Sequence, residues 1–125
     1  MKRILLIDDD EEFRVRVQKF LFNAGFHVET AADGHEALQK ARGSPPELIL
    51  LDVVMPKMSG LQVARLLKFD EKSKKIPIIM MSVLDQPTDM EQGKAVGVSL
   101  YLTKPFSDEE LLSAVRKLLG EGKSA

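Results

Sequence analysis

The sequence of 125 residues contains no cysteine. It therefore offers no disulfide framework, no thiolate metal site and no thiol nucleophile. An excess of one charge is also missing, because 18 lysine and arginine residues stand against 19 aspartate and glutamate residues, for a formal net charge of −1. This balance provides no bulk electrostatic attraction to nucleic acid or to an anionic membrane, so we expect the chain to bind neither directly.

Long hydrophobic runs are absent as well. No apolar stretch approaches the roughly 20 residues that a membrane-spanning helix requires. The few apolar residues after Lys2 and Arg3 run directly into acidic residues, unlike a secretory signal peptide. The two histidines, His27 and His35, lack carboxylate or histidine neighbours at the spacing of metal ligands. We therefore expect a cytoplasmic protein whose residues 1–119 form one domain, followed by a flexible tail or linker start at residues 120–125.

Short apolar runs and helical patterns alternate along the chain. The apolar runs predict strands at residues 3–7, 27–31, 48–51, 78–81 and 99–102. Several are apolar on successive residues, which is typical of strands buried on both faces of a parallel sheet. Between them, apolar residues recur at helical spacing, as at Phe13 and Val17, while a weaker helix is predicted at residues 88–96. The alternation predicts the α/β class, with a doubly wound (βα)5 sandwich.

Polar residues mark the starts of several predicted helices. In the acidic run after the first strand, Asp10 is placed to cap a helix whose first turn holds Glu11 and Glu12. Ser107 begins a capping box before the last helix. The helix after Ser59 and Gly60 is expected to bury three apolar residues on one face, namely Val63, Leu66 and Leu67.

The residues that end the predicted strands carry the chemistry. Asp8 and Asp9 follow the first strand, Asp52 the third, Ser82 the fourth and Lys104 the fifth. In doubly wound sheets, ligands bind outside the carboxyl ends of the strands, where the strand order reverses. We therefore expect three carboxylates, one hydroxyl and one ammonium group on a single rim of the sheet.

Such a rim would suit phosphoryl transfer. Three carboxylates at close range require either a raised pKa or a bound cation. Oxygen ligands without histidine or cysteine favour a hard divalent ion such as Mg²⁺. The Lys104 ammonium is suited to a phosphoryl oxygen and the Ser82 hydroxyl to a hydrogen bond. With a carboxylate nucleophile, these are the parts of a phosphoryl-transfer site.

The chain resembles the receiver domain of two-component response regulators in four motifs, each at the end of a predicted strand. They are IDD at residues 7–9, LLDVVMPKMSG at 50–60, MS at 81–82 and YLTKPF at 101–106. The resemblance spans residues 2–119. It implies a CheY-like, flavodoxin-like fold with a five-stranded parallel sheet of order 2-1-3-4-5. It also implies a phosphorylation-dependent signalling switch of a two-component phosphorelay, which takes part in its own phosphorylation and dephosphorylation and is not an enzyme.

The resemblance also implies a role for each site residue. Asp52 would accept a phosphoryl group from the phosphohistidine of a sensor histidine kinase or phosphotransfer protein. Asp9 would be a direct Mg²⁺ ligand and Asp8 would hold a metal-bound water, while Asp52 and the backbone carbonyl of Val54 would complete the protein ligands. Lys104 would pair with the phosphoryl group.

Signal output is implied for the surface of the fourth helix, fifth strand and fifth helix. Ser82 would hydrogen-bond the phosphoryl group, and Tyr101 would turn inward as Ser82 moves. The Lys104–Pro105 peptide bond would be cis. The implied downstream partner is an effector protein or a fused output domain, with the chain a monomer or a phosphorylation-promoted dimer. Whether it is a stand-alone regulator or part of a longer protein is left open.

Three residues depart from the commonest family pattern. Val83 stands where the family usually has a small residue. Val54 and Leu84 are apolar at the two positions that help to position or exclude the hydrolytic water. Since neither side chain can orient a water molecule, we expect slow loss of the phosphoryl group.

Three alternatives remain at this point. Tyr101 could serve only in packing, since amphipathic aromatic residues are common at surfaces. The chain could be a phosphotransferase or phosphatase with an Asp nucleophile, although Val54 stands where such enzymes commonly carry a second Asp. It could also be an interaction module that is independent of phosphorylation.

Overall fold

The structure is a computed structural model that describes residues 1–83 and 87–120. Leu84 and the predicted tail from residue 121 lie outside the described residues. The strands are Lys2–Ile7 (β1), Phe26–Ala31 (β2), Leu48–Asp52 (β3), Ile78–Ser82 (β4) and Leu100–Thr103 (β5). The helices are Glu11–Asn23 (α1), Gly34–Gly43 (α2), Gly60–Phe69 (α3), Pro87–Val96 (α4) and Asp108–Leu119 (α5). No helix in this described part is long and apolar enough to cross a membrane.

The five strands form one parallel sheet in the order β2-β1-β3-β4-β5, as predicted. The chain passes from β1 outward to β2 and then returns to the other side of β1 to form β3. The strand order therefore reverses between β1 and β3, where Ile7 pairs with Leu51. Asp8 follows Ile7 and Asp52 follows Leu51, so this register places the two aspartates side by side at the carboxyl edge of the sheet.

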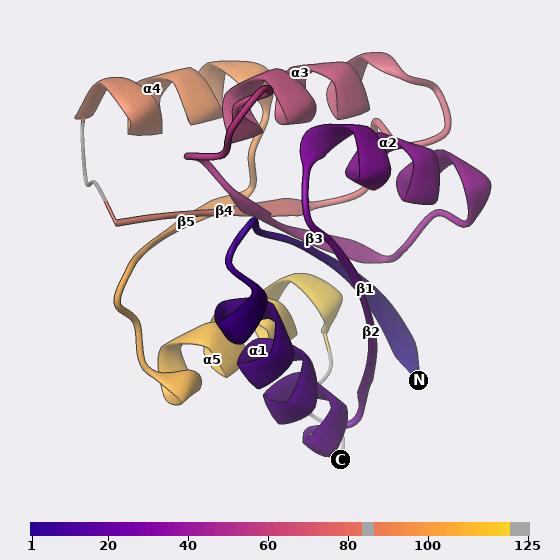
Figure 1. The fold of residues 1–125 in the computed structure, drawn as a ribbon, viewed down its shortest axis with the longest axis vertical. Coiled ribbons are helices and arrows are strands. Elements are labelled where there is room, and N and C mark those ends of the chain that lie inside the picture. Colours follow the sequence, from indigo (N-terminus) through magenta and orange to yellow (C-terminus); the bar gives the residue numbers. More distant parts are fainter. Residues whose placement is uncertain (84–86, 121–125) are drawn as a thin grey trace.

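The sheet lies between two layers of helices. Figure 1 shows α1 and α5 on one face and α2, α3 and α4 on the other. Successive strand residues supply opposite faces, so Leu5 and Ile7 enter the core on the α2–α4 side while Ile4 and Leu6 enter the core on the α1–α5 side. Burying each such side chain is worth about 1.5–3 kcal/mol. Burial on both faces therefore explains why the strands are apolar without alternation.

Strands β3, β4 and β5 end one residue later than predicted, and β1 and β2 begin one residue earlier. Strand β5 starts at Leu100, one residue after the predicted start, although the Ser99 amide already donates to the Ile78 carbonyl. It continues to Thr103, which pairs with Ser82 at the end of β4. Asp52 and Ser82 are themselves the last residues of β3 and β4. These two candidate site residues are thus held by the sheet itself.

Side-chain caps fix where the helices begin. Asp10 accepts a hydrogen bond from the Phe13 amide at the start of α1, and both Ser59 and Ser107 form capping boxes, as predicted for Asp10 and Ser107. Each cap satisfies an amide that would otherwise lack a partner in the first helical turn. Because each cap closely follows a strand, it also limits the length of the loop at the carboxyl edge.

The buried face of α3 differs from the predicted one. Val63 and Leu67 are buried as expected, but Ala64 takes the third position and Leu66 is 42% exposed. Positions 60, 63, 64 and 67 share one side of a helix, whereas residue 66 lies on its flank.

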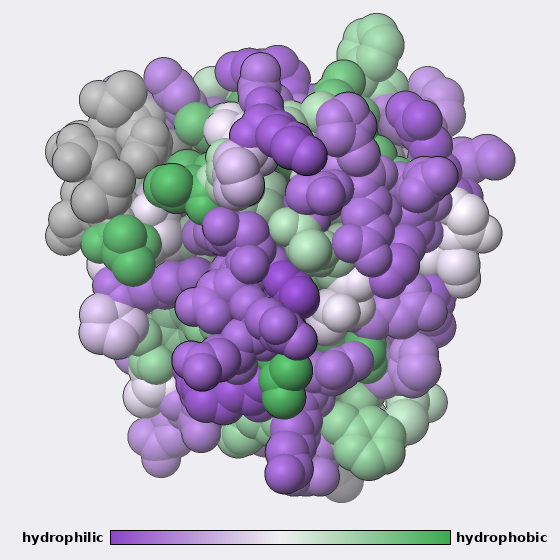
Figure 2. Space-filling model, viewed as in Figure 1, coloured by the Kyte–Doolittle hydropathy of each residue, from purple (hydrophilic) through white to green (hydrophobic). Residues whose placement is uncertain are grey.

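In Figure 2 the visible face of the molecule is mainly hydrophilic, with hydrophobic side chains in separate spots. Isolated exposed apolar residues of this kind are common in folded domains.

The start of α3 touches the backbone of the β3 end. The Gly60 amide donates to the Val53 carbonyl oxygen at 2.8 Å. A Cβ atom at Gly60 would lie 2.1 Å from the Asp52 carbonyl oxygen and 2.8 Å from the Val53 Cα. These are backbone atoms of the core sheet, so they cannot move aside cheaply. Glycine at this position therefore allows α3 to approach Asp52.

We expect Gly60→Ala to lower the free energy of unfolding by about 1–3 kcal/mol, because the added methyl group would overpack the backbone at the end of β3. Urea denaturation measures this change. Gly43→Ala is the matched control, since a Cβ atom at Gly43 would meet nothing within 4 Å. Equal stability changes in the two variants would contradict the proposed close contact.

Candidate functional site

Asp8 is buried at the end of β1, with only 1% of its surface exposed. Its Oδ1 accepts from the Asp10 amide at 2.9 Å, and its Oδ2 accepts from the Lys104 Nζ at 2.7 Å. Its backbone carbonyl also accepts from Nη1 of Arg14 at 2.7 Å. The carboxylate is thus held from the start of α1 on one side and from the end of β5 on the other.

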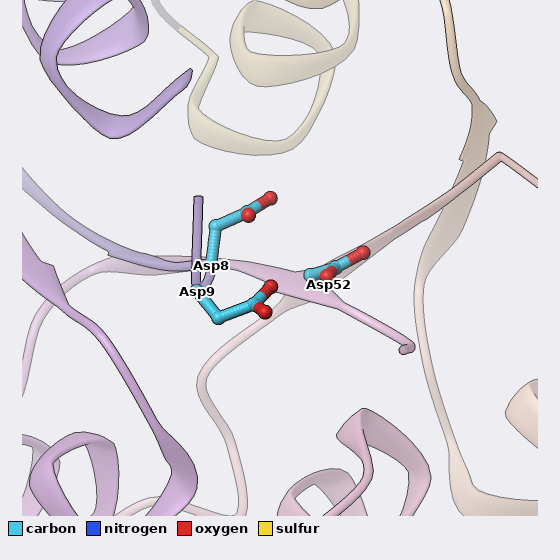
Figure 3. Close-up of side chains that lie close together, drawn as sticks. All are labelled: Asp8, Asp9 and Asp52. Carbon is cyan, nitrogen blue, oxygen red and sulfur yellow. The ribbon is translucent and has the colours of Figure 1, made fainter. Parts of the chain in front are cut away.

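Asp52 and Asp9 complete an acidic cluster with Asp8. One carboxylate oxygen of each residue lies within 4.8 Å of one such oxygen of the other two. Figure 3 shows the three side chains at the end of the central strands, with the Asp9 carboxylate directed toward Asp52. Asp8 and Asp52 are buried, whereas Asp9 is exposed. The cluster therefore has one open side, and its three carboxylates could hold a metal ion.

Lys104 is the cation of this cluster. It directly follows β5, and its amide donates to the Ser82 carbonyl at 2.7 Å. Its ammonium nitrogen lies 2.7 Å from an Asp8 oxygen and 3.6 Å from an Asp52 oxygen, and its side chain is only 15% exposed. The Lys104–Pro105 peptide bond is cis, as predicted.

The environment of Asp52 disfavours its charged form. Burial, and then the charge of Asp8, raise the pKa of the Asp52 carboxyl from 3.8 to about 6, and Asp9 adds to this effect. Lys104 opposes the shift but does not cancel it. One lysine beside three carboxylates leaves the cluster with an excess of negative charge when all three are ionised. A metal ion held by these oxygen ligands would relieve the remaining repulsion.

The other predicted site residues lie around the cluster at different distances along the sheet. Ser82 is buried at the end of β4, one residue beyond Met81, which pairs with Asp52. Tyr101 lies within β5, half-buried against the core on the α2–α4 side. Val54 and Val83 follow Asp52 and Ser82 and are 55% and 64% exposed. Exposed apolar side chains thus follow the carboxyl ends of β3 and β4.

The sequence did not reveal two contacts of the site. Phe13 fits the apolar pattern of α1, but the structure also places its ring centre 4.1 Å from the Lys104 Nζ. The hydrogen bond from Arg14 to the Asp8 carbonyl was not predicted either. Only their place in the sequence could have indicated these contacts, because both residues lie in the first turns of a helix that starts shortly after Asp8 and Asp9.

Taken together, fold and site define a class of protein. It is a doubly wound α/β domain with an acidic cluster and a lysine at the point where the strand order reverses, the usual ligand site of such sheets. The family model of the response regulator receiver domain matches residues 4–116. The chain belongs to the response regulator receiver domain family, which confirms the predicted family and fold.

Known relatives include regulators and chemotaxis proteins. The chain is 38% identical over 124 residues to the alkaline phosphatase synthesis transcriptional regulatory protein PhoP of Bacillus subtilis, covering 99% of this chain and 51% of that protein. It therefore spans about half the length of PhoP. The structure of chemotaxis protein CheY4 of Vibrio cholerae superimposes with a TM-score of 0.91 and 38% identity, covering 94% of this chain and 98% of that one.

A third similar structure carries a metal ion. The receiver domain of sensor histidine kinase PA1611 from Pseudomonas aeruginosa has a magnesium ion coordinated in its active site cleft. It matches with a TM-score of 0.88 and 28% identity, covering 96% of this chain and 98% of that one. At the level of the family, the chain is a receiver domain for phosphorylation-dependent signalling in two-component systems.

We expect Asp52→Asn to stabilise the metal-free protein at neutral pH. The pKa of the Asp52 carboxyl is about 6 in the fold, against 3.8 ordinarily, so its ionisation costs the folded state free energy. The neutral Asp52 carboxyl therefore contributes stability to the folded state. This contribution is fully present below pH 3.8 and is lost as the pH rises through about 6. The difference in free energy of unfolding between Asp52→Asn and the wild type should therefore be about 1–3 kcal/mol more favourable to the variant at pH 7.5 than near pH 3.5.

Urea denaturation in EDTA at the two pH values measures the difference. Glu91→Gln, which changes an exposed carboxylate on α4, is the control. A gain for Asp52→Asn that is the same at both pH values would show that the neutral form of Asp52 is not favoured by the fold.

Proposed function

We propose that Asp52 is the phosphoacceptor of a signalling switch, taking a phosphoryl group from the phosphohistidine of a sensor histidine kinase or phosphotransfer protein. The observation that carries this proposal is the meeting of a buried carboxylate, two further carboxylates and the Lys104 ammonium at the switch point of the sheet. This group of residues supplies a nucleophile and a cation for the developing charge.

The transfer would use Asp52 in its ionised form. An Asp52 oxygen would attack the phosphorus, the bond between phosphorus and the histidine nitrogen would break, and the released imidazole would take up a proton. Charge develops on the phosphoryl oxygens during such a transfer. Lys104 lies 3.6 Å from Asp52 and closer to Asp8, so its ammonium would shift from Asp8 toward the phosphoryl oxygens.

We assign Mg²⁺ to the acidic cluster. Asp9 and Asp52 would be direct ligands together with the backbone carbonyl of Val54, and Asp8 would hold a metal-bound water. The donor set fits, because it contains only oxygen atoms and retains net negative charge beside Lys104. The similar receiver domain with magnesium in its cleft supports the assignment. When bound, the ion would neutralise carboxylate and phosphoryl charge.

The output would pass through Ser82 and Tyr101 to the surface of α4, β5 and α5. Tyr101 borders a hollow that is also lined by Gly93, Lys94 and Val98, so an inward turn of its ring would change this surface. Moving a switch from 1:99 to 99:1 takes about 5.5 kcal/mol of differential interaction. Hydrogen bonds from Ser82 and Lys104 to a charged phosphoryl group, at about 1.5–3 kcal/mol each, can supply most of it.

The remaining assignments follow from the same function. We place the receiver domain at residues 1–119, with residues 120–125 as a tail or linker start. The receiver would act in the cytoplasm, as a monomer or as a phosphorylation-promoted dimer. Its downstream partner would be an effector protein or a fused output domain, without direct nucleic-acid binding by the receiver itself.

Acetyl phosphate with Mg²⁺ is expected to add one phosphoryl group to the wild-type chain and none to Asp52→Asn, as measured by intact mass. Asp33→Asn is the matched control, because Asp33 caps α2 outside the acidic cluster and should leave the modification intact. An unmodified wild type, or equal modification of Asp52→Asn, would refute Asp52 as the acceptor.

Phospho-Asp52 is expected to decay slowly, over minutes or longer, because the exposed Val54 side chain cannot hold a water molecule for attack on the phosphorus. Val54→Asn supplies polar groups there and should shorten the lifetime several-fold. A time course of intact mass after removal of acetyl phosphate measures the decay. Val15→Asn, which changes a similarly exposed valine on α1, should decay like the wild type. Decay of the wild type within seconds would contradict this prediction.

A further inference from the structure

The aromatic ring of Phe13 lies against the lysine of the site. Phe13 is in the first turns of α1, and its ring centre is 4.1 Å from the Lys104 Nζ. At this distance an ammonium group is attracted to the face of the ring. Phe106, two residues after Lys104, meets the same ring at a centroid distance of 6.1 Å and an interplanar angle of 81°. The contact therefore links the start of α1 to the loop after β5.

The ring gives Lys104 a partner that differs in kind from its carboxylates. The hydrogen bond to Asp8 requires a particular direction, whereas attraction to a ring face tolerates a shift of the ammonium. Lys104 is only 15% exposed, so water can replace little of this contact. An ammonium that leaves Asp8 for a phosphoryl group on Asp52 could remain over the ring throughout.

Neighbouring contacts fix the orientation of the ring. The edge-to-face contact with Phe106 holds one part of it. The Arg16 guanidinium lies 5.6 Å from the ring centre and also pairs with Asp108 at 3.4 Å, which ties α1 to the start of α5. A leucine in place of Phe13 could fill similar core space, but it would offer no ring face to Lys104.

We propose that Phe13 is a positioning residue, which holds the Lys104 ammonium beside the acidic cluster through its ring face. The inference rests on the proposed function, in which Lys104 pairs with the phosphoryl group on Asp52. Phe13 acts through Lys104 and makes no contact with the reacting atoms in this proposal. Without the Phe13 ring, the Lys104 ammonium would spend less time beside the acidic cluster, where it assists the transfer.

The contact itself can be tested by NMR without any phosphorylation. Protons on the Lys104 Cε should resonate upfield of those of the other lysines, because they lie over a ring. The displacement should persist in Phe13→Tyr and disappear in Phe13→Leu. Ordinary lysine shifts for Lys104 in the wild type would overturn the proposal.

The consequence for transfer can be tested with the rate of Asp52 modification by acetyl phosphate and Mg²⁺. Phe13→Leu should slow it by about 3- to 30-fold, the range that corresponds to loss of one cation–π contact. Phe13→Tyr, which keeps the ring, should retain the wild-type rate. Phe20→Leu makes the same change at a half-buried position of α1 and should also leave the rate unchanged.

A double-mutant cycle separates positioning from general packing. In a Lys104→Met background, Phe13→Leu should cause no further slowing, because the residue through which it acts is gone. Equal slowing in both backgrounds, or an unchanged rate in Phe13→Leu, would overturn the proposal. Circular dichroism confirms folding, and Phe13→Met replaces Phe13→Leu if the latter unfolds. If the wild type takes up no phosphoryl group, the proposed function fails, and the NMR shifts still decide whether the ring holds Lys104.

Discussion

Repulsion among Asp8, Asp9 and Asp52 is the constraint on which the rest of the site depends. The reversal of strand order places β1 and β3 side by side, so their terminal carboxylates cannot separate without breaking the sheet. Carboxylate oxygens of the three residues lie within 4.8 Å of one another, and repulsion between two ionised groups at such a distance is on the order of 1–3 kcal/mol, least where the exposed Asp9 is screened by water. Lys104 offsets part of this cost, and burial together with the charges of Asp8 and Asp9 raises the pKa of the Asp52 carboxyl. With this excess of negative charge, binding of a cation or a change of charge at Asp52 would alter the interactions among all four side chains.

The scaffold withstands this repulsion because hydrogen bonds continue beyond the strand pairs. The Asp8 amide donates to the Ala31 carbonyl, and the Val53 amide donates to the Met81 carbonyl. The Lys104 amide likewise donates to the Ser82 carbonyl. These bonds tie the end of β1 to β2, and the ends of β3, β4 and β5 to one another, at the edge where the charges gather. The apolar register below them, buried on both faces, makes any displacement of β1 or β3 costly.

Much of the fold and the list of candidate site residues could be predicted, because both depend on local patterns. Apolar runs, capping residues and polar strand ends are visible in the sequence, and parallel topology then brings the strand ends together. Contacts that depend on packing were not predictable. The exposure of Leu66, the ring of Phe13 over Lys104 and the approach of Gly60 to Asp52 each depend on how separate elements meet.

Backbone strain near the site was equally hidden. Lys57 adopts a φ of 70°, and the Met58 amide donates to the Pro56 carbonyl at 2.7 Å across it, as in a tight three-residue turn. A non-glycine residue in this region costs about 1–2 kcal/mol, and no propensity favours lysine there. The turn leads directly to the Ser59 cap and to Gly60, whose amide is bonded to Val53. The strained turn is therefore part of a short loop that the Gly60 hydrogen bond ties back to the end of β3, next to the proposed phosphoacceptor Asp52.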